Sequence, residues 1–347
     1  MKIYKSLFDQ IISPESLFSA WDAFKSDKRK KKDVRAFEWR LEQNIFQLHR
    51  ELKNKTYKHS TYEGFYIRDP KQRHVHKASV RDRVLHHAIF SVINPIFEKT
   101  FIATSFSCRI GFGNHEGVKA LERMVRKISA NGTRPCFILK CDIQKFFDSV
   151  NHGILLSIIR KRIKDEDAMR LFKEVVESFS SPNSILFEQR GLPIGNLTSQ
   201  LFANIYMNEF DQFVKHDLKV KNYARYTDDF VVVAEDQNSL ETLLARFREF
   251  LERKLALKLH PKKVGIHKFH NGIDFLGYVV FSKHRLVRSK TKRRMIAKLK
   301  HRLEEYKLGK IEKLAVDQSL QSYLGVLSHA NAKNLADELK NGIWFLG

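Results

Sequence analysis

Two adjacent carboxylates stand in the run Tyr226-Thr227-Asp228-Asp229-Phe230. The β-branched residues that follow them and the short run before them favour strands, which predicts a hairpin with the carboxylates at its tip. Two like charges this close are unfavourable unless a cation neutralises them, so the pair points to a divalent metal. An ordinary Asp-Asp turn on the surface of a β protein is the alternative, and this run alone leaves it open.

A third carboxylate, Asp142, ends a second predicted strand, the apolar run from Cys136 to Cys141. An isolated aspartate at a strand end is usually structural, but this one is followed in the chain by the Asp-Asp hairpin. Carboxylates that converge from two strands can hold two metal ions, which activate a hydroxyl nucleophile and stabilise the leaving oxygen in an in-line phosphoryl transfer. Asp142, Asp228 and Asp229 therefore predict a two-metal phosphoryl-transfer site.

The spacing of apolar residues predicts the helices that surround these aspartates. Helices are expected over residues 1–60, 80–97, 195–215 and 239–255. Pro95 is expected to end the second of them, because proline cannot continue the helical hydrogen-bond ladder.

Two short strand-like pieces within residues 62–75 flank Asp69-Pro70, which is a turn signal. The hairpin that they predict carries three cations, Arg68, Lys71 and Arg73. Binding of a triphosphate needs several cations because the leaving pyrophosphate accumulates negative charge.

The chain is strongly basic, with 63 Lys and Arg against 39 Asp and Glu and a net charge of +24. Its hydrophobic content of 43% is enough to build a core and still present a large cationic surface. Phosphate backbones are the expected counterpart of such a surface, with an affinity that falls steeply as salt rises. A basic protein without such a partner and a membrane-surface protein are the alternatives, but neither requires the three aspartates.

The N-terminal residues are charged and interrupted, so they predict no secretory signal. Three cysteines, Cys108, Cys136 and Cys141, leave an odd thiol and show no metal-ligand spacing. With no apolar run of about 20 residues, which a membrane span needs, the sequence predicts a reduced, cytoplasmic protein.

From Tyr62 to Gly277 the chain resembles the reverse transcriptases, whose polymerase motifs it carries in their usual order. Tyr226 to Asp229 resembles the catalytic hairpin of that family, and Asp142 with Phe146-Phe147 resembles its first catalytic strand. The loop that lies against the incoming nucleotide has its counterpart in Leu192-Pro193-Ile194-Gly195, and the primer-holding hairpin in Phe275-Leu276-Gly277-Tyr278.

Ile194 departs from most of the family, which has glutamine there. The run from Gly195 to Tyr206 and the C-terminal Ser322-Tyr323-Leu324-Gly325 are similar to the reverse transcriptases of diversity-generating retroelements. Those enzymes copy a template RNA and misincorporate opposite adenine, and the mutated cDNA then replaces part of a target gene (mutagenic retrohoming). The resemblance implies the same function here.

The resemblance also implies roles for individual residues. Two Mg²⁺ ions, for which Mn²⁺ can substitute, are expected on Asp142, Asp228 and Asp229. The incoming nucleotide is expected to contact Arg68, Lys71, Arg73, the backbone at Ile143, the steric gate Phe147, Ile194, Gly195 and Lys263, with Lys262 as an alternative to Lys263. Template and primer are expected to contact Arg109, Gln200, Tyr226, Leu276 and Gly277.

The fold class implied is α+β, a right-hand polymerase whose palm is an antiparallel sheet with packed helices. Predicted domains are a helical N-terminal extension (1–60), fingers and palm (61–280) and a basic helical thumb (281–347), in which Met295, Ile296, Leu299 and Leu303 form an apolar stripe. Expected partners are template RNA, the RNA–DNA duplex, deoxynucleotides and a small basic ring-forming accessory protein, but no membrane.

Two alternatives remain after the motifs are considered. One is a faithful or defence-associated reverse transcriptase with the same catalytic residues but without mutagenesis. The other is a non-catalytic RNA-binding protein on the same fold, which the intact aspartates disfavour.

Overall fold

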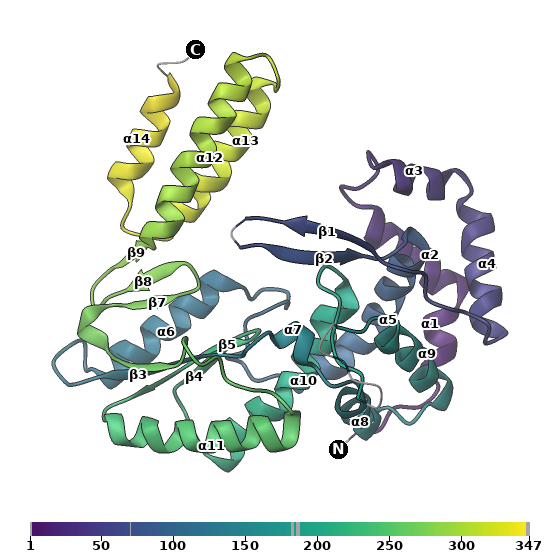
Figure 1. The fold of residues 1–347 in the computed structure, drawn as a ribbon, viewed down its shortest axis with the longest axis horizontal. Coiled ribbons are helices and arrows are strands. Elements are labelled where there is room, and N and C mark those ends of the chain that lie inside the picture. Colours follow the sequence, from purple (N-terminus) through teal and green to yellow (C-terminus); the bar gives the residue numbers. More distant parts are fainter. Residues whose placement is uncertain (1, 70, 182–183, 185–187, 345–347) are drawn as a thin grey trace. The chain divides into compact units, whose positions relative to one another are not determined.

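A computed structural model describes residues 2–69, 71–181, 184 and 188–344 (Figure 1). The chain forms two compact units, each made of three chain segments. Unit 1 comprises residues 1–109, 142–220 and 245–262, and unit 2 comprises residues 110–141, 221–244 and 263–347. The compact units therefore follow no single cut along the chain, and the boundaries predicted at residues 60 and 280 stay a prediction.

Unit 1 begins with four helices, α1 (Phe8–Ile12), α2 (Pro14–Lys25), α3 (Lys32–Trp39) and α4 (Leu41–Lys53), which confirm the predicted helical start. Helix α2 starts at Pro14 because the hydroxyl of Ser13 accepts a hydrogen bond from the Ser16 amide at 3.1 Å. Its buried face, with Trp21 and Phe24, packs against α5.

The predicted hairpin forms from β1 (Glu63–Ile67) and β2 (Arg73–Lys77), which pair antiparallel. Helix α5 (Val80–Glu98) follows, capped by Ser79. The expectation that Pro95 ends this helix is wrong, since Pro95 lies inside it. Pro95 stands in the last turn, so the helix loses only one hydrogen bond there and continues to Glu98.

Four further helices complete the main part of unit 1: α7 (Phe146–Ser149), α8 (His152–Arg162), α9 (Glu166–Glu177) and α10 (Leu197–Gln212), with a π turn over Phe213–Asp217. Asn151 and Asp165 cap α8 and α9 through their side chains. Helix α10 begins two residues later than predicted, because Gly195 has a φ of 110°, which is incompatible with a helix.

Unit 2 is built on a four-stranded sheet of order β4-β5-β3-β6. The strands are β3 (Phe137–Asp142), β4 (Tyr223–Tyr226), β5 (Asp229–Ala234) and β6 (Gly265–Lys268). Pairs β4–β5 and β3–β6 are antiparallel, and α6 (Asn114–Ile128) packs on β4 and β5. Phe230 to Val233 are all buried because β5 has a strand on each side and is covered by packed elements.

Helix α11 (Gln237–Leu255) follows β5 closely, as predicted for residues 239–255. A short 3-10 turn (Phe269–Asn271) then leads into a three-stranded sheet of β7 (Ile273–Phe275), β8 (Tyr278–Val280) and β9 (Arg285–Val287).

The C-terminal part of unit 2 consists of α12 (Ser289–Lys307), α13 (Lys313–Leu327) and α14 (Lys333–Trp344), where α13 packs on both α12 and α14 (Figure 1). The predicted apolar stripe of α12 is confirmed, because Met295 and Leu299 are buried and Ile296 and Leu303 pack beside them. Among the described residues, no helix is both long enough and apolar enough to span a membrane.

Candidate active site

The predicted Asp-Asp hairpin is confirmed, and its turn is tight. Tyr226 pairs with Asp229, so Thr227 and Asp228 alone form the turn between β4 and β5. Thr227 has a φ of 55°, which is rare for a β-branched residue and costs about 1–3 kcal/mol. Backbone strain of this size persists only where the surroundings hold it, so the turn that presents the carboxylates has a fixed shape.

Arg225 helps to hold this turn. Its side chain is fully buried within β4, and its Nη1 donates a hydrogen bond to the Thr227 carbonyl at 2.9 Å. A buried guanidinium is stable only when its donors are satisfied, so Arg225 fixes the backbone beside Asp228. The sequence analysis missed this residue, although an arginine inside an apolar strand is a signal for a buried polar contact.

Asp142 is the last residue of β3, and β3 is the sheet neighbour of β5. The strand that ends at Asp142 therefore lies beside the strand that starts at Asp229. Asp142 is buried, and its carbonyl accepts a hydrogen bond from the His260 amide at 2.8 Å. The Gln144 amide donates to the Lys258 carbonyl at 2.9 Å, so residues 142–144 are held by the segment 258–260.

The donor chemistry of this strand end suits a hard divalent cation. Within the described ranges, no group of three or more His, Cys, Asp or Glu side chains forms a metal-binding arrangement. Mg²⁺ is usually bound through one or two carboxylates together with water and substrate phosphates, so it requires no larger cluster of protein ligands. Asp142, Asp228 and Asp229 each supply a carboxylate of this kind, and their role as Mg²⁺ ligands stays a prediction.

The expected nucleotide-facing loop packs on the expected steric gate. The Leu192 amide donates to the Phe147 carbonyl at 2.7 Å, and the Gly191 amide donates to the Val150 carbonyl at 2.8 Å. Phe147 is half-buried, whereas the neighbouring Phe146 is fully packed. Unit 1 thus holds the Phe147 backbone in place and leaves part of its ring accessible.

The same loop is also hydrogen-bonded to the hairpin of β1 and β2, which we call the fingers hairpin. The Ile194 carbonyl accepts a hydrogen bond from the His76 amide at 3.0 Å, and Nδ2 of Asn196 donates to the His76 carbonyl at 2.9 Å. A Cβ placed on Gly195 would lie 2.8 Å from Cγ1 of Val75. Only glycine allows β2 and this loop to approach so closely at a φ of 110°.

We expect Gly195→Ala to destabilise the protein by about 1–3 kcal/mol, because alanine is strained at this φ and its Cβ clashes with Val75. Urea unfolding measures the effect, and the Michaelis constant for deoxynucleotide should rise. The control is Gly153→Ala in α8, where the nearest atom to the new Cβ is Oδ1 of Asn151 at 3.4 Å. That change should stabilise the protein by up to about 1 kcal/mol. If Gly195→Ala also left the stability unchanged or increased it, the packing argument would be contradicted.

The three predicted cations of the fingers hairpin lie at its tip. Arg73 is the first residue of β2 and pairs with Ile67, while Arg68 and Lys71 stand in the connection. All three are exposed, and none forms an ion pair with another described residue. Their charges are therefore available to an anionic ligand.

Residues 57–280 match the family described as reverse transcriptase (RNA-dependent DNA polymerase). The chain belongs to this family. All the residues predicted to bind metal, nucleotide, template or primer lie within the matched region.

Relatives in curated collections include two bacterial proteins. Protein YkfC of Escherichia coli is 26% identical over 247 residues, which is 62% of this chain and 63% of that protein. Group II intron-encoded protein LtrA of Lactococcus lactis subsp. cremoris is 22% identical over 374 aligned residues, covering 88% of this chain and 58% of LtrA. The chain thus spans less than two thirds of the length of either relative.

Among solved structures, the apo telomerase of Candida tropicalis truncated from its C-terminal domain has a TM-score of 0.50 and 11% identity. The similarity covers 71% of this chain and 60% of the telomerase chain. The right-hand polymerase fold of mixed helices and antiparallel sheet is thereby confirmed.

The expected primer-holding turn has the geometry of a tight hairpin. Phe275 pairs with Tyr278, which leaves Leu276 and Gly277 as the turn, with φ values of 49° and 92°. Two left-handed residues in succession form the two-residue turn that best matches strand twist. The Gly277 carbonyl accepts a hydrogen bond from the Arg288 amide at 3.0 Å, so the turn is also tied to the start of α12.

Arg109 has a structural role that the sequence did not predict. Its guanidinium donates to Glu98 and to the Ile102 carbonyl, both at 2.8 Å, and to the Ser105 carbonyl at 2.6 Å. The side chain is nearly buried. It therefore fixes the loop after α5, and its predicted template contact stays a prediction.

The other predicted contact residues lie in differing surroundings. Ile143 is buried and bridges to Leu259, while Gln200 is exposed in the first turn of α10. Tyr226 is half-buried at the end of β4, and Lys263 is exposed after the turn at Pro261. Their roles toward nucleotide, template and primer stay predictions.

A buried polar network surrounds Asp82 in the first turn of α5, the helix that follows the fingers hairpin. The carboxylate of Asp82 accepts hydrogen bonds from the Tyr57 hydroxyl at 2.8 Å and the Ser79 hydroxyl at 2.6 Å. Burial alone would raise the pKa of Asp82, but His59 and these hydroxyls lower it below its ordinary value. Burial also lowers the pKa of His86, which contacts His59, to about 3, so His86 is neutral at physiological pH.

Proposed function

We propose that this protein is an RNA-directed DNA polymerase. Support comes from one observation above all: the strand that ends at Asp142 is the sheet neighbour of the strand that starts at Asp229, within a chain of the reverse transcriptase family. Nucleotide addition requires carboxylates on adjacent strands, a gate beside the sugar and cations for the triphosphate, and the sequence supplies each of them.

Asp142, Asp228 and Asp229 would hold two Mg²⁺ ions, with Mn²⁺ as a possible substitute. When bound, Mg²⁺ lowers the pKa of the attacking hydroxyl and neutralises charge on the phosphates. The protein orients the reactants: Arg225 fixes the turn that presents Asp228, and the backbone contact at Asp142 holds the end of β3. The primer 3′-hydroxyl would lose its proton to water as its oxygen bonds to the α-phosphorus, and the bond between that phosphorus and the bridging oxygen would break, so that pyrophosphate leaves with the electrons of that bond.

The nucleotide would contact both the exposed tip of the fingers hairpin and the loop at Ile194, which are joined at His76. Arg68, Lys71 and Arg73 are free to bind the triphosphate, with Lys263 or Lys262 as a further cation near the leaving pyrophosphate. The backbone at Ile143 and the corner at Gly195 would shape the pocket. Template would contact Gln200 and Arg109, and primer would contact Tyr226, Leu276 and Gly277.

Primer extension tests the proposal directly. Purified protein, a short RNA template annealed to a DNA primer, deoxynucleotides and Mg²⁺ should give extended cDNA, and omission of Mg²⁺ should stop it. If the protein binds the duplex but extends no primer with either Mg²⁺ or Mn²⁺, it is an RNA-binding protein on a polymerase fold and the proposal fails.

We further infer that copying is error-prone opposite adenine and serves targeted gene diversification. Ile194 supports this inference, because its side chain offers only packing where a glutamine would offer hydrogen bonds. Its backbone is held by His76, so an isoleucine-to-glutamine change would replace the side chain without moving the loop. A faithful or defence-associated reverse transcriptase is the competing function, and one relative of this chain is a group II intron-encoded protein.

Partners follow from the same inference. The protein would act in the bacterial cytoplasm on a template RNA, with a small basic accessory protein that forms a ring. Two basic proteins repel each other, so RNA would supply much of the attraction between them. An isolated chain that made full-length, site-specific cDNA without any partner would exclude the accessory protein.

Ile194→Gln should lower misincorporation opposite template adenine several-fold, and at most about tenfold. One positioning hydrogen bond is worth about 0.5–1.5 kcal/mol, and 1.4 kcal/mol corresponds to about tenfold. Deep sequencing of cDNA made by both proteins on one template measures the error at each base. Ile194→Leu, which keeps the side chain apolar, is the control and should retain the original error rate. Equal errors opposite adenine for Ile194→Gln and the unaltered protein would leave Ile194 without a role in fidelity.

A further inference from the structure

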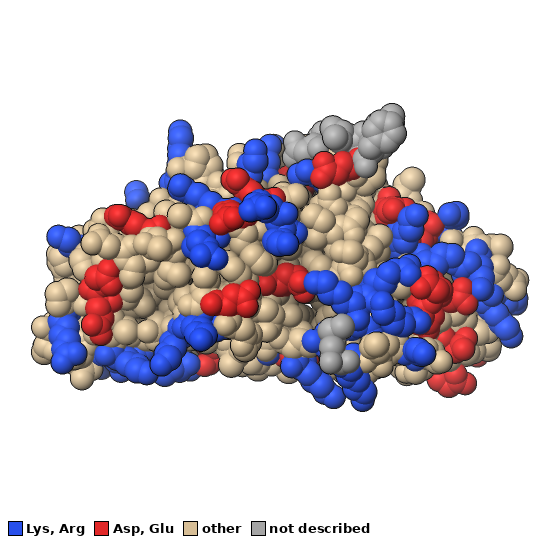
Figure 2. All heavy atoms as spheres, turned by 90° about the horizontal axis from the view of Figure 1, so that it is seen from below, with Lys and Arg blue, Asp and Glu red and all other residues tan. Residues whose placement is uncertain are grey.

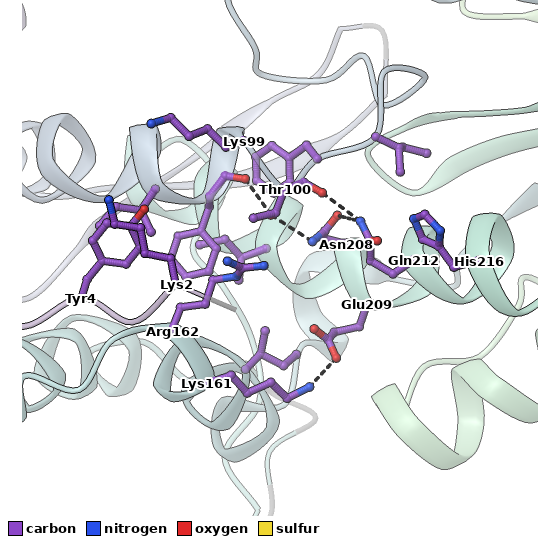
Figure 3. A pocket seen from close by; sticks show the side chains of 16 residues that line it. Lys2, Tyr4, Lys99, Thr100, Lys161, Arg162, Asn208, Glu209, Gln212 and His216 are labelled. Atoms are coloured by element: carbon purple, nitrogen blue, oxygen red, sulfur yellow. Dashed lines mark hydrogen bonds and ion pairs between the residues drawn. The ribbon is translucent and has the colours of Figure 1, made fainter.

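A cavity of about 630 Å³ lies in unit 1, and none of the residues assigned above to catalysis, nucleotide, template or primer is among those that line it (Figure 3). It is lined by the N-terminal segment, the end of α5, the end of α8 and one side of α10. A volume of this size lies within the usual range for small-ligand sites.

The lining of this cavity is strongly cationic. Four basic residues, Lys2, Lys99, Lys161 and Arg162, face a single carboxylate, Glu209. Lys161 forms an ion pair with Glu209 at 2.5 Å. Lys2, Lys99 and Arg162 form no ion pair with any residue in the described part of the chain, so their positive charge is uncompensated and favours an anion.

The two cations that matter most are held by backbone contacts. The Tyr4 amide donates to the Arg162 carbonyl, and the Lys164 amide donates to the Tyr4 carbonyl, both at 2.9 Å. These bonds fix the N-terminal segment against the end of α8. Nζ of Lys2 lies 5.3 Å from the centre of the Tyr4 ring, and this cation–π contact keeps the ammonium beside Tyr4. Figure 3 shows Lys2, Tyr4 and Arg162 gathered at one end of the cavity.

The remaining walls are rigid and partly apolar. Nδ2 of Asn208 donates to Oγ1 of Thr100 at 3.2 Å, and Nε2 of Gln212 donates to the Thr100 carbonyl at 2.8 Å. These bonds fasten α10 to the end of α5 (Figure 3). Tyr4 and Ile102 line the cavity and are half-buried, whereas Phe97 and Ile205 in the same lining are almost fully covered. A ligand with an anionic group and a flat apolar body matches this combination.

We propose that the cavity binds a nucleotide of the RNA substrate outside the catalytic centre, with its phosphate at Lys2 and Arg162 and its base against the apolar wall. The choice of RNA as ligand rests on the proposed function. Aromatic and apolar surfaces beside a cationic groove are how proteins bind single strands without reading sequence. A basic partner protein would be repelled by these charges.

Stabilisation of helix ends explains part of this charge but not all of it. Lys99 is the C-terminal cap of α5 and Arg162 is the last residue of α8, where cations interact favourably with the helix dipole. Lys2 lies on no helix, yet it lines the same cavity. Lys2 is exposed, so its ammonium is available to an anionic ligand in this cavity.

The test compares two double variants that change the net charge by the same amount. Lys2→Glu/Arg162→Glu alters the cavity, and Lys53→Glu/Lys254→Glu alters exposed residues in the last turns of α4 and α11. We expect the cavity variant to bind a long RNA about tenfold more weakly than the control variant. The slope of log affinity against log salt should fall by about 0.7 more, as expected for one lost phosphate contact on a single strand. Extension of a short primer on a short template should be equal in both, so failure of the polymerase proposal would be seen separately.

Equal long-RNA affinity of the two variants would overturn the proposal. If the glutamates prevent folding, Lys2→Gln/Arg162→Gln replaces them with the same expectation of sign. Ultraviolet crosslinking of RNA to the unaltered protein gives an independent measurement, and crosslinked peptides should include residues 2–4 or 158–162. Crosslinks confined to other segments contradict the assignment. Competition with free AMP or ATP shows whether the cavity binds a free nucleotide or one within RNA. If only millimolar AMP or ATP reduces the crosslink, the ligand is a nucleotide within RNA. If micromolar concentrations reduce it, RNA is not the ligand and the proposal is overturned.

Discussion

Asp142→Asn and Asp228→Asn should each reduce Mg²⁺-dependent cDNA synthesis by about a thousandfold or more. Replacing a carboxylate by a neutral amide removes a ligand charge from the metal, and a bound metal contributes several kcal/mol of transition-state stabilisation. Single-turnover primer extension at saturating deoxynucleotide measures the loss. Affinity for the primer–template should change little, because RNA binding depends on the basic surface and not on these aspartates.

The control is Glu235→Gln. Glu235 directly follows β5, so it is an exposed carboxylate at the opposite end of the strand from Asp229. Its neutralisation should leave extension within about twofold, since surface substitutions away from special features have small effects. Substantial extension by either aspartate variant, with Glu235→Gln equally active, would overturn the two-metal assignment.

Phe147→Ala should let ribonucleotides into the growing strand, lowering discrimination against them by about 10- to 100-fold. A rigid ring beside the sugar leaves no room for a 2′-hydroxyl, and one added group at a pocket wall is worth about 1–3 kcal/mol. The contact from Leu192 is to the Phe147 carbonyl, so truncation of the ring keeps the backbone in place. The ratio of catalytic efficiencies for a deoxynucleotide and its ribonucleotide measures the effect.

Phe147→Tyr is the matched control, because it keeps the ring and should retain discrimination. Both variants should unfold at similar urea concentrations, since Phe147 is only half-buried while Phe146 carries the packing in this turn. Discrimination that stays the same in Phe147→Ala would show that the ring does not face the sugar.

The positive charge that we expect to govern RNA binding is spread over the surface. Figure 2 shows Lys and Arg side chains spread across one face, with Asp and Glu interspersed among them. Both the affinity for RNA and its salt dependence are therefore expected to come from many sites, of which the cavity at Lys2 and Arg162 is one.

Local patterns predicted most of the elements correctly. The spacing of apolar residues predicted α5 and α12, and the β-branched run after Asp229 predicted β5. The prediction that Pro95 ends α5 was wrong. A proline in the last turn removes one backbone hydrogen bond, and the helix still continues to Glu98. The start of α10 was misplaced because Gly195 adopts a left-handed φ to approach Val75, a contact between segments far apart in the chain.

The sequence by itself determined the family, the order of the motifs and the residues with the right chemistry, because these depend on residue type and spacing. Tertiary structure alone decided that β3 lies beside β5 and that Arg225 donates a hydrogen bond to the turn at Thr227. It also decided that Arg109 binds Glu98 and two backbone carbonyls. It alone also brought Lys2 next to Arg162. Such pairings depend on the packing of distant segments, where burial and hydrogen-bond satisfaction select one partner among many that the sequence allows.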